Sequence, residues 1–182
     1  MKKEHPKNGL HTEYFENGKK KEGNYKDGKK EGIWTMWYEN GQKKSEGKFK
    51  DGKEDGKWTE WDEDGQIKIE RNYKDGVLVS VTTYTYYENG QIKIERNYKD
   101  GKLDGNIKHW YENGRKSKEG RYKDGSYDGV WTDWYENGQK KQVRYYKDGW
   151  EEGKWIYWDK NGQIISQEEY KDGECISGDC PD

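Results

Sequence analysis

Two glycine-containing turns alternate along almost all of the 182-residue chain, and their regular spacing constrains the fold more than any other feature. The first turn is Asn-Gly or Asp-Gly, and its glycines are Gly18, Gly41, Gly65, Gly90, Gly114, Gly138 and Gly162, in steps of 23, 24, 25, 24, 24 and 24 residues. The glycines of the second turn, Lys-Asp-Gly, are Gly28, Gly52, Gly76, Gly101, Gly125, Gly149 and Gly173. A fixed period in this range is typical of repeat proteins. We therefore expect one array of seven units over residues 9–173, between an N-terminal tail (1–8) and a C-terminal tail (174–182).

Each unit is predicted to be a β-hairpin. Segments rich in Trp, Tyr and Thr flank the Asn-Gly turn, and these residue types suit a pleated strand. Asn-Gly is the strongest short signal for a two-residue type I′ turn, because both central residues need a positive φ. The predicted fold class is therefore all-β, with about 14 strands forming an elongated, single-layer antiparallel sheet of about seven stacked hairpins, with no helices of note.

The composition explains how so polar a chain can fold. Only 27% of its residues are hydrophobic and 40% are charged, a balance that by itself favours disorder. However, the chain contains 10 Trp, 16 Tyr and 2 Phe residues, and each such ring buries about 150–250 Å² when packed. The burial that holds the array together is therefore expected to be mainly aromatic.

The aromatic residues occupy fixed places in the unit. Alternation along a strand puts Trp34, Met36 and Tyr38 on one face and Trp37 on the other. Stacking of the repeats is expected to align the first Trp of each unit with one aromatic residue of the second strand into ladders. The predicted structural core consists of Trp34, Trp58, Trp131, Trp155, Tyr25, Phe49, Tyr73, Tyr98, Tyr122, Tyr146 and Tyr170.

Residues 23–32 and 120–129 follow the pattern Gly-x-aromatic-x-x-Gly-x-x-x-Gly, which resembles the core of the MORN repeat. The longer unit, with Trp-Tyr-Glu-Asn-Gly, is similar to the bacterial variant of this repeat, and the resemblance extends over residues 9–173. It implies consecutive β-hairpins in a curved, extended sheet and a binding scaffold without catalysis. Many proteins of this kind are described as antitoxins of toxin–antitoxin systems or as immunity proteins. MORN arrays elsewhere serve in protein–protein contacts and have been linked to membrane lipids.

One stretch, residues 76–87, departs from the repeat. It has one extra residue, Ser80 where other units have glycine, no Trp, and an enrichment in β-branched and aliphatic side chains. Two interpretations stay open: a bulge or kink between sub-arrays of three and four repeats, or an edge at which a partner docks by strand addition. On the second interpretation, the candidate partner-binding residues are Val79, Val81 and Tyr84.

Two further aromatic residues are candidates for an exposed binding patch. Tyr127 and Trp150 occupy positions that other copies fill with lysine, namely Lys29, Lys53 and Lys102. The core therefore does not require an aromatic ring at these positions, and aromatic residues dominate the energetics of protein interfaces. Packing within the array is the alternative.

Cys175 and Cys180 in the C-terminal tail are the only cysteines of the chain. A disulfide between them would close a small loop and needs an oxidising compartment, and two free thiols are the alternative. Four intervening residues and no clustered histidines give too few ligands for a metal site. No metal and no cofactor is therefore expected.

No constellation of residues predicts an enzyme. His5, His11 and His109 are scattered along the chain and are expected at the surface. The glutamates that precede the Asn-Gly turns recur with the unit, whereas a catalytic pair is a singular feature. Nucleic-acid binding needs a basic surface, but the formal net charge is −2.

The function predicted from these features is a non-catalytic scaffold that binds another protein, and the resemblance implies an antitoxin or immunity protein that neutralises a toxin by direct binding. The alternative is a membrane-surface or cell-envelope scaffold that binds anionic lipid through aligned lysine pairs such as Lys43/Lys44 and Lys140/Lys141. The unpaired end strands of an open array also permit an edge-to-edge homodimer. A bacterial cytoplasmic location is preferred, with an extracytoplasmic one as the alternative if the N-terminus is processed.

Overall fold

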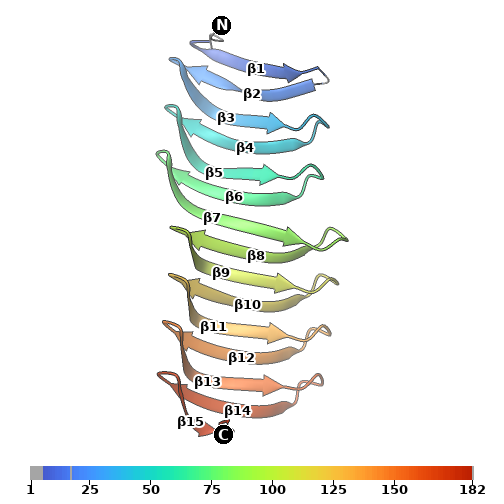
Figure 1. Ribbon diagram of the computed structural model, residues 1–182, viewed down its shortest axis with the longest axis vertical. Coiled ribbons are helices and arrows are strands. Elements are labelled where there is room, and N and C mark those ends of the chain that lie inside the picture. The colour runs from blue at the N-terminus through green and yellow to red at the C-terminus, as the bar shows by residue number, and fades with distance from the viewer. Residues whose placement is uncertain (1–5, 17, 182) are drawn as a thin grey trace. The chain divides into compact units, whose positions relative to one another are not determined.

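The computed structural model describes residues 6–16 and 18–181, and within them the chain forms fifteen β-strands and no helix (Figure 1). The strands belong to two compact units, Met1–Thr83 and Tyr84–Asp182, and each unit is treated by itself below. Most of the predicted N-terminal tail, including His5, lies outside the described residues. The all-β, antiparallel hairpin architecture predicted from the repeats is confirmed.

The strands of each unit follow one another in the sheet in the order of the sequence, each antiparallel to the next, so each unit is a single layer. The first unit contains β1 (Gly9–Phe15), β2 (Gly18–Lys26), β3 (Lys29–Trp37), β4 (Lys43–Lys50), β5 (Lys53–Trp61), β6 (Ile67–Lys74) and most of β7 (Val77–Tyr86). The second unit contains the end of β7, β8 (Ile92–Lys99), β9 (Lys102–Trp110), β10 (Lys116–Lys123), β11 (Ser126–Trp134), β12 (Lys140–Lys147), β13 (Trp150–Trp158), β14 (Ile164–Lys171) and β15 (Glu174–Gly178). The fifteenth strand lies in the segment that the sequence analysis treats as a tail.

The tight turn of the hairpins is Asp-Gly, and the prediction that Asn-Gly forms the type I′ turn is wrong. In all seven Lys-Asp-Gly turns both the Asp and the Gly have a positive φ, as at Asp51 (51°) and Gly52 (84°). Two positive φ values in a two-residue loop are the signature of a type I′ turn. Asp tolerates this conformation because its short polar side chain is compatible with the left-handed region.

The Asn-Gly turn is a longer loop with only one positive φ, at the glycine. The amide of Gly41 donates to the carbonyl of Tyr38 at 3.0 Å, and the amide of Tyr38 donates to the carbonyl of Gln42 at 2.9 Å. The side-chain oxygen of Asn40 accepts from the amide of Gln42 at 2.9 Å. This is a three-residue loop in which a type I turn is followed by a glycine in the left-handed region. Asn is selected here because its side chain caps the loop.

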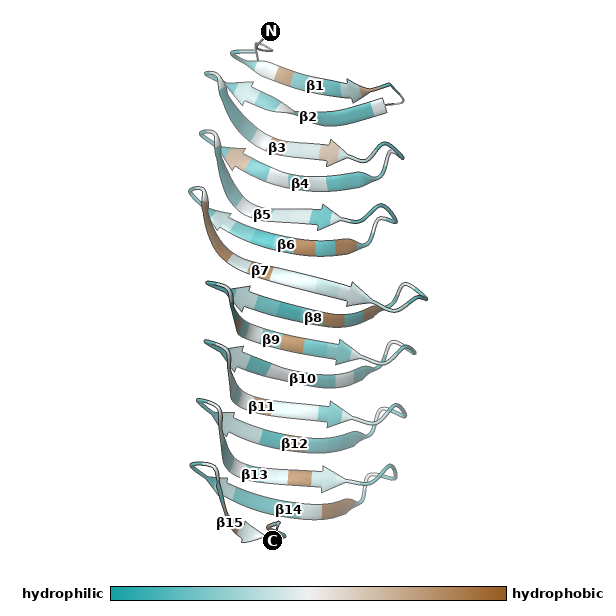
Figure 2. Ribbon diagram, in the orientation of Figure 1, coloured by the Kyte–Doolittle hydropathy of each residue, from teal (hydrophilic) through white to brown (hydrophobic). Residues whose placement is uncertain are grey.

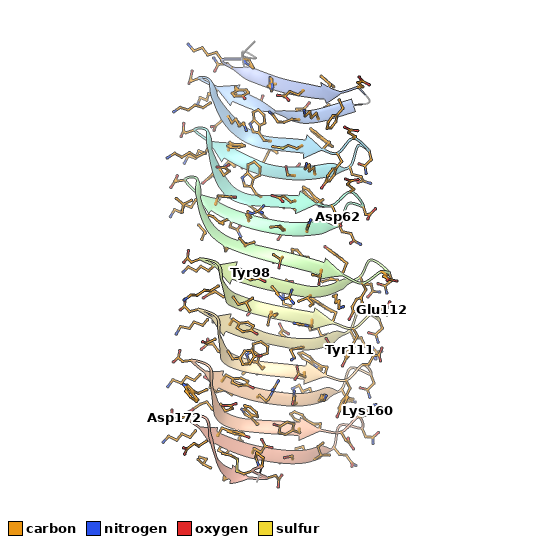
Figure 3. All side chains as sticks on the ribbon, viewed as in Figure 1. Asp62, Tyr98, Tyr111, Glu112, Lys160 and Asp172 are labelled. Carbon is orange, nitrogen blue, oxygen red and sulfur yellow. A yellow bond between two sulfur atoms is a disulfide. The ribbon has the colours of Figure 1, made fainter. Side chains whose placement is uncertain are left out.

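Hydrogen bonds from four of these loops join a repeat to the following one within the same unit. The Tyr38 hydroxyl donates to the carbonyl of Trp61 at 2.9 Å, and the Asn40 amide donates to the carbonyl of Glu63 at 2.9 Å. The same tyrosine bond recurs in the second unit as Tyr87 to Trp110, Tyr111 to Trp134 and Tyr135 to Trp158. In the second unit Figure 3 shows Tyr111, Glu112 and Lys160 at one end of the strands and Asp172 at the other. The hairpins are therefore tied together at their loop ends as well as through the sheet.

The irregular stretch contains a bulge and the boundary between the two units. Residues 77–83 of β7 pair with β6, and the register shifts between Asn72 and Tyr73. The division of the chain falls at Thr83, inside this stretch. Ser80 has no positive φ, in contrast to the glycines at the corresponding position of other repeats. Figure 2 shows that β7 begins with hydrophobic residues.

The last strand, β15, is held to β14 by more than its ladder. Cys175 and Cys180 are joined by a disulfide. The Asp179 amide donates to the carbonyl of Gln167 at 2.8 Å, and the Asp179 carboxylate accepts from the amide of Gln167 at 3.1 Å. The disulfide and these two bonds hold the end of the chain against the backbone of β14.

Candidate binding face

In each of the two units, one face of the sheet carries the first Trp of the repeats and is here called the aromatic face. It is built on pairs of glycine and tryptophan from adjacent strands. A Cβ atom added to the glycine would lie about 2 Å from the indole, so the ring rests directly on the glycine backbone. The pairs and their distances to Trp Cδ2 are Gly23–Trp34 (2.2 Å), Gly47–Trp58 (2.0 Å) and Gly120–Trp131 (2.1 Å). In each first Trp the indole N–H also donates to a backbone carbonyl ten residues earlier, at 3.1–3.2 Å. Sequence and backbone together therefore fix the orientation of these rings.

In the first unit the rings form a continuous edge-to-face ladder. The centroid distances are 5.2 Å for Tyr25–Trp34, 6.1 Å for Trp34–Phe49, 5.0 Å for Phe49–Trp58 and 6.4 Å for Trp58–Tyr73. Tyr25, Trp34 and Phe49 are buried, while Trp58 and Tyr73 are half-buried. Edge-to-face contacts of this kind add to the burial of area. The ladder holds together a sheet that has no second layer within the unit.

Lys30 covers two rings of this ladder. Its Nζ lies 4.7 Å from the ring centroid of Trp34 and 4.4 Å from that of Phe49. Burial lowers the pKa of Lys30, and the neighbouring Lys21 lowers it further. A cation over two aromatic faces is stabilised by the rings, so a lysine can occupy this position of the core.

In the second unit the ladder includes one aliphatic residue and one additional ring. Ile107 is buried where four other repeats have Trp, and it packs in one cluster with Trp131, Tyr146 and Trp155. The centroid distances are 5.2 Å for Tyr122–Trp131, 4.3 Å for Tyr127–Trp131, 5.0 Å for Tyr127–Tyr146, 5.2 Å for Tyr146–Trp155 and 4.4 Å for Trp155–Tyr170. Tyr98, Tyr122 and Tyr170 are half-buried. These residues line one face without being covered by another element of the unit.

The hydroxyls of Tyr122, Tyr157 and Tyr170 remain protonated at neutral pH. Burial raises the pKa of Tyr157 and Tyr170 to about 12, and the nearby carboxylate of Glu168 adds to the effect. Both hydroxyls donate to Glu168, at 3.2 and 3.0 Å. Burial, with a contribution from Tyr127, also raises the pKa of Tyr122 to about 12. The face therefore presents hydroxyl donors and acceptors beside its rings.

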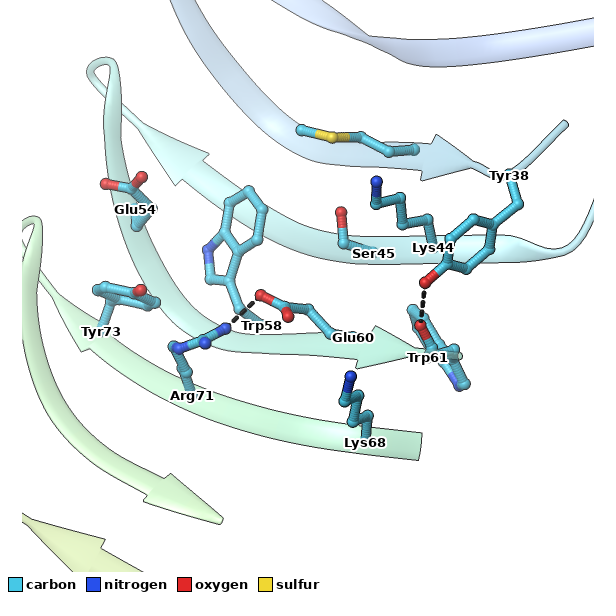
Figure 4. Close-up of a pocket in the computed structure, with 11 residues that line it drawn as sticks. Tyr38, Lys44, Ser45, Glu54, Trp58, Glu60, Trp61, Lys68, Arg71 and Tyr73 are labelled. Atoms are coloured by element: carbon cyan, nitrogen blue, oxygen red, sulfur yellow. Dashed lines mark hydrogen bonds and ion pairs between the residues drawn. The ribbon is translucent and has the colours of Figure 1, made fainter. Parts of the chain in front are cut away.

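A second row of the aromatic face, here called the polar row, lies five residues before each glycine of the Asn-Gly loops. Its members are Glu13, Met36, Glu60, Thr85, His109, Asp133 and Tyr157. Glu60 forms an ion pair with Arg71, which crosses a hollow of about 410 Å³ lined also by Trp58 and Tyr73 (Figure 4). The carboxylate of Glu60 and the guanidinium of Arg71 thus neutralise each other in the lining of the hollow.

Asp133 is the most enclosed carboxylate of the polar row, with a side chain only 8% exposed. Its Oδ2 accepts from Arg144 Nη2 at 3.0 Å and from the side-chain amide of Gln142, and its Oδ1 lies 3.6 Å from Lys118 Nζ. A buried carboxylate is stable only when paired and hydrogen-bonded. Oδ2 meets that requirement, whereas Oδ1 is buried with the Lys118 ion pair and no hydrogen bond.

His11 and His109, expected at the surface, are both half-buried on the aromatic face. His11 contacts Tyr25 and Trp34, at ring distances of 5.6 and 6.3 Å. Burial lowers the pKa of His109, and Lys118 and Arg96 lower it further, while Asp133 acts in the opposite direction. The expectation of surface histidines is wrong because His11 takes the position of the first Trp in its repeat and His109 is a member of the polar row, and both positions face the rings.

The candidates of the irregular stretch belong to different units. Val79 is 44% exposed and Val81 is half-buried, and both lie in the part of β7 whose backbone pairs with β6. Tyr84 is half-buried and belongs to the second unit. Docking at Val79, Val81 and Tyr84 stays a prediction.

The structure does not bring Tyr127 and Trp150 together in one patch. Tyr127 pairs across the turn with Tyr122, a position filled by Lys30 in the first unit, so its assignment to the Lys29 position is one residue out of register. It is 38% exposed and packs in the aromatic ladder.

Trp150 does occupy the Lys29 position, as the pairing of Lys147 with Trp150 and of Lys26 with Lys29 shows. It is 64% exposed, and its ring lies over Gly173 of the next turn, where an added Cβ would meet Trp150 Cε3 at 2.7 Å. Trp150 therefore covers a turn, outside the aromatic ladder.

Contacts within the sheet engage three of the four lysines of the two pairs, Lys43, Lys44 and Lys141. Lys43 donates to Glu46 at 2.7 Å, and Lys44 lies over the ring of Tyr38 at 5.3 Å. Lys116 likewise donates to Glu119 at 2.6 Å, and Lys141 lies over the ring of Tyr135 at 5.9 Å. These contacts balance or shield much of the positive charge that a row of lysines would need in order to bind anionic lipid.

Within residues 6–16 and 18–181, no group of three or more His, Cys, Asp or Glu side chains is arranged to hold a metal ion. The same part of the chain contains no helix long and apolar enough to cross a membrane.

Three features of this face were not identified from the sequence. The Gly–Trp pairs are visible as a glycine eleven residues before Trp34, Trp58 and Trp131. The tyrosine bonds between repeats are visible as a tyrosine 23 residues before a tryptophan. The polar row has no such signal, because its residue type changes in nearly every copy.

These observations define the class of the protein as a single-layer β-hairpin repeat scaffold with an open aromatic face. The chain matches the MORN repeat variant in seven segments, and it belongs to this family. The matched segments are residues 7–27, 30–51, 54–75, 81–100, 103–124, 127–148 and 151–172. Comparison with curated proteins gives no match. MORN repeats form scaffolds that are commonly involved in binding and generally lack catalytic activity.

Proposed function

We propose that the chain is a non-catalytic scaffold that binds a protein partner on the aromatic face and acts as an antitoxin or immunity protein by covering a toxin. One observation carries the proposal. The aromatic face of the second unit leaves Tyr127 38% exposed among packed rings, with no other described element of that unit over it. Partly exposed tyrosines held rigidly by their neighbours are typical of protein interfaces.

The repeat suggests a variant that tests the face without disturbing the fold. Tyr127→Lys introduces the residue that occupies the corresponding position, Lys30, in the first unit. Val130→Lys is the matched control, because Val130 is 57% exposed and lies on the opposite face of the same strand.

The experiment co-expresses the chain with the product of the neighbouring gene and measures growth and complex formation. We expect the native chain and Val130→Lys to bind that product and restore growth, and Tyr127→Lys to bind at least tenfold more weakly. Equal binding by Tyr127→Lys and Val130→Lys would remove the aromatic face from the interface. A neighbouring product that is neither toxic nor bound would contradict the antitoxin role.

The alternative of an anionic lipid surface is tested with the same variants. Flotation with vesicles of phosphatidylserine and phosphatidylcholine, at low and high salt, measures lipid binding directly. Because Lys43, Lys44 and Lys141 are engaged, we expect no flotation at physiological ionic strength. Salt-sensitive flotation without a protein partner would favour the lipid role.

A further inference from the structure

Arginines on the aromatic face follow a rule that one repeat breaks. Arg71 pairs with Glu60, and Arg144 pairs with Asp133 at 3.0 Å. In both cases the acid is the polar-row residue eleven positions before the arginine. The array therefore supplies each of these arginines with its own carboxylate.

Arg96 is the exception. The residue eleven positions before it is Thr85, which is exposed and carries no charge. The next member of the polar row is His109, again not an acid. Within the part of the chain that the structure describes, no carboxylate forms an ion pair or hydrogen bond with Arg96.

The neighbours of Arg96 add positive charge instead of removing it. His109 lies opposite Lys118 in the β9–β10 pair, and Arg96 lies opposite Ile107, two residues before His109. Lys118 reaches Asp133, but Asp133 is already held by Arg144. On the aromatic face from β8 to β12, three permanent cations (Arg96, Lys118 and Arg144) and the neutral His109 thus share a single buried carboxylate, that of Asp133.

We propose that Arg96, His109 and Lys118 form a binding site for a carboxylate side chain of the protein partner. The inference rests on the proposed function and names the chemistry that the partner presents to this part of the face. A carboxylate accepts two parallel hydrogen bonds from the planar guanidinium of Arg96. It also replaces the acid that this repeat lacks.

The surroundings favour a protein carboxylate over a lipid phosphate. Tyr98, Ile107 and Tyr122 lie on the same face next to the site, and aromatic residues beside a cationic one match the composition of protein interfaces. The chain as a whole has a formal net charge of −2, which gives no general attraction to an anionic bilayer.

The test uses the full chain and a hexaglutamate peptide, with binding measured by calorimetry at low ionic strength. We expect Arg96→Gln and Thr85→Glu each to weaken binding by roughly tenfold, since one loses the cation and the other supplies the missing internal acid. Arg71→Gln is the matched control and should change binding less than twofold, because Arg71 already has its partner. Circular dichroism verifies that each variant is folded.

A second readout follows the ring of His109 by NMR. A carboxylate bound beside it stabilises the protonated imidazole, so hexaglutamate should raise its pKa, and binding should tighten as the pH falls from 7.5 to 5.5. This pH dependence should be lost in His109→Gln. Lys118, Arg96 and Asp133 are the charged groups that face this ring, and all three are retained in that variant.

Three outcomes would overturn the inference. They are unchanged binding by Arg96→Gln, equal weakening by Arg71→Gln, and binding of inorganic phosphate or phosphatidylserine vesicles in the absence of hexaglutamate binding. The proposed function and the carboxylate site can fail independently of each other. If the native chain and Arg96→Gln capture the neighbouring gene product equally, the scaffold role stands and the carboxylate site does not. If neither captures it while hexaglutamate still binds at Arg96, the site stands and the partner assignment fails.

Discussion

The contact between a glycine and an indole determines which substitutions the glycine position tolerates. Gly120 lies in an extended strand without a positive φ, so its requirement does not come from the backbone conformation. It comes from Trp131, whose Cδ2 would lie 2.1 Å from an added Cβ. The smallest residue is therefore required for reasons of packing.

Gly120→Ala is expected to lower the free energy of unfolding by about 1–3 kcal/mol, because the indole must move to accommodate the methyl group. Urea denaturation of the variant and the native chain measures the loss. In a Trp131→Val background the same substitution should cost much less. An equal cost in both backgrounds would show that the indole is not the cause.

His109 is expected to make stability depend on pH. Its pKa is lowered in the folded chain from the ordinary value of 6.5, by burial first and then by Lys118 and Arg96. The unfolded chain therefore takes up the proton first as the pH falls. The stabilisation is present above about pH 6.5 and is lost as the pH falls through the lower, folded-state pKa.

Denaturation at pH 7.5 and pH 5.0 tests this sign. The native chain should lose more stability between the two values than His109→Gln, whose side chain does not titrate. A loss of the same size in both proteins would mean that other groups account for the pH dependence.

At the level of the elements, the two turns have exchanged the roles that their sequences indicate. Asn-Gly and Asp-Gly both favour hairpins, and the dipeptide alone does not show which loop is longer. The structure places the type I′ turn at Asp-Gly because the Asn side chain of the other loop is used to cap its own backbone. Asp51 therefore needs a left-handed conformation, with a φ of 51°.

Asp51→Val is expected to destabilise the chain by about 1–2 kcal/mol, because a β-branched residue is strained at positive φ. Asp51→Asn should be close to neutral, since asparagine also adopts this conformation. Thermal unfolding followed by circular dichroism compares the two variants. Equal midpoints would contradict the assignment of the type I′ turn.

Most of the fold was predictable because the repeat supplies the same information seven times. The period predicts the hairpins, and alternation along the strands predicts which face carries Trp34 and Trp131. The site was less predictable because it depends on departures from the repeat. Ile107 in the core and Thr85, eleven positions before Arg96, acquire meaning only when each is compared with the residue that other copies have at the same position.

For the whole molecule, modular construction predicts which deletions are tolerated. Removing residues 115–138 excises one complete repeat of 24 residues and joins Gly114 directly to Gln139. Because each repeat packs mainly against its neighbours, this shortened chain should keep a cooperative unfolding transition. Removing residues 115–126 deletes β10 with the turn that follows it, reverses every later strand and should abolish cooperativity. Denaturation curves and hydrogen exchange distinguish the two outcomes.

The tyrosine that bonds to the following repeat is replaced by aspartate at two positions, Asp62 and Asp159. Asp62 belongs to the last Asn-Gly-type loop of the first unit, and Asp159 to the last such loop of the second. Each aspartate caps its own loop and has no hydroxyl to extend onward. The residue that opens each loop, tyrosine or aspartate, therefore shows from the sequence alone which loops can donate a hydrogen bond to the following repeat.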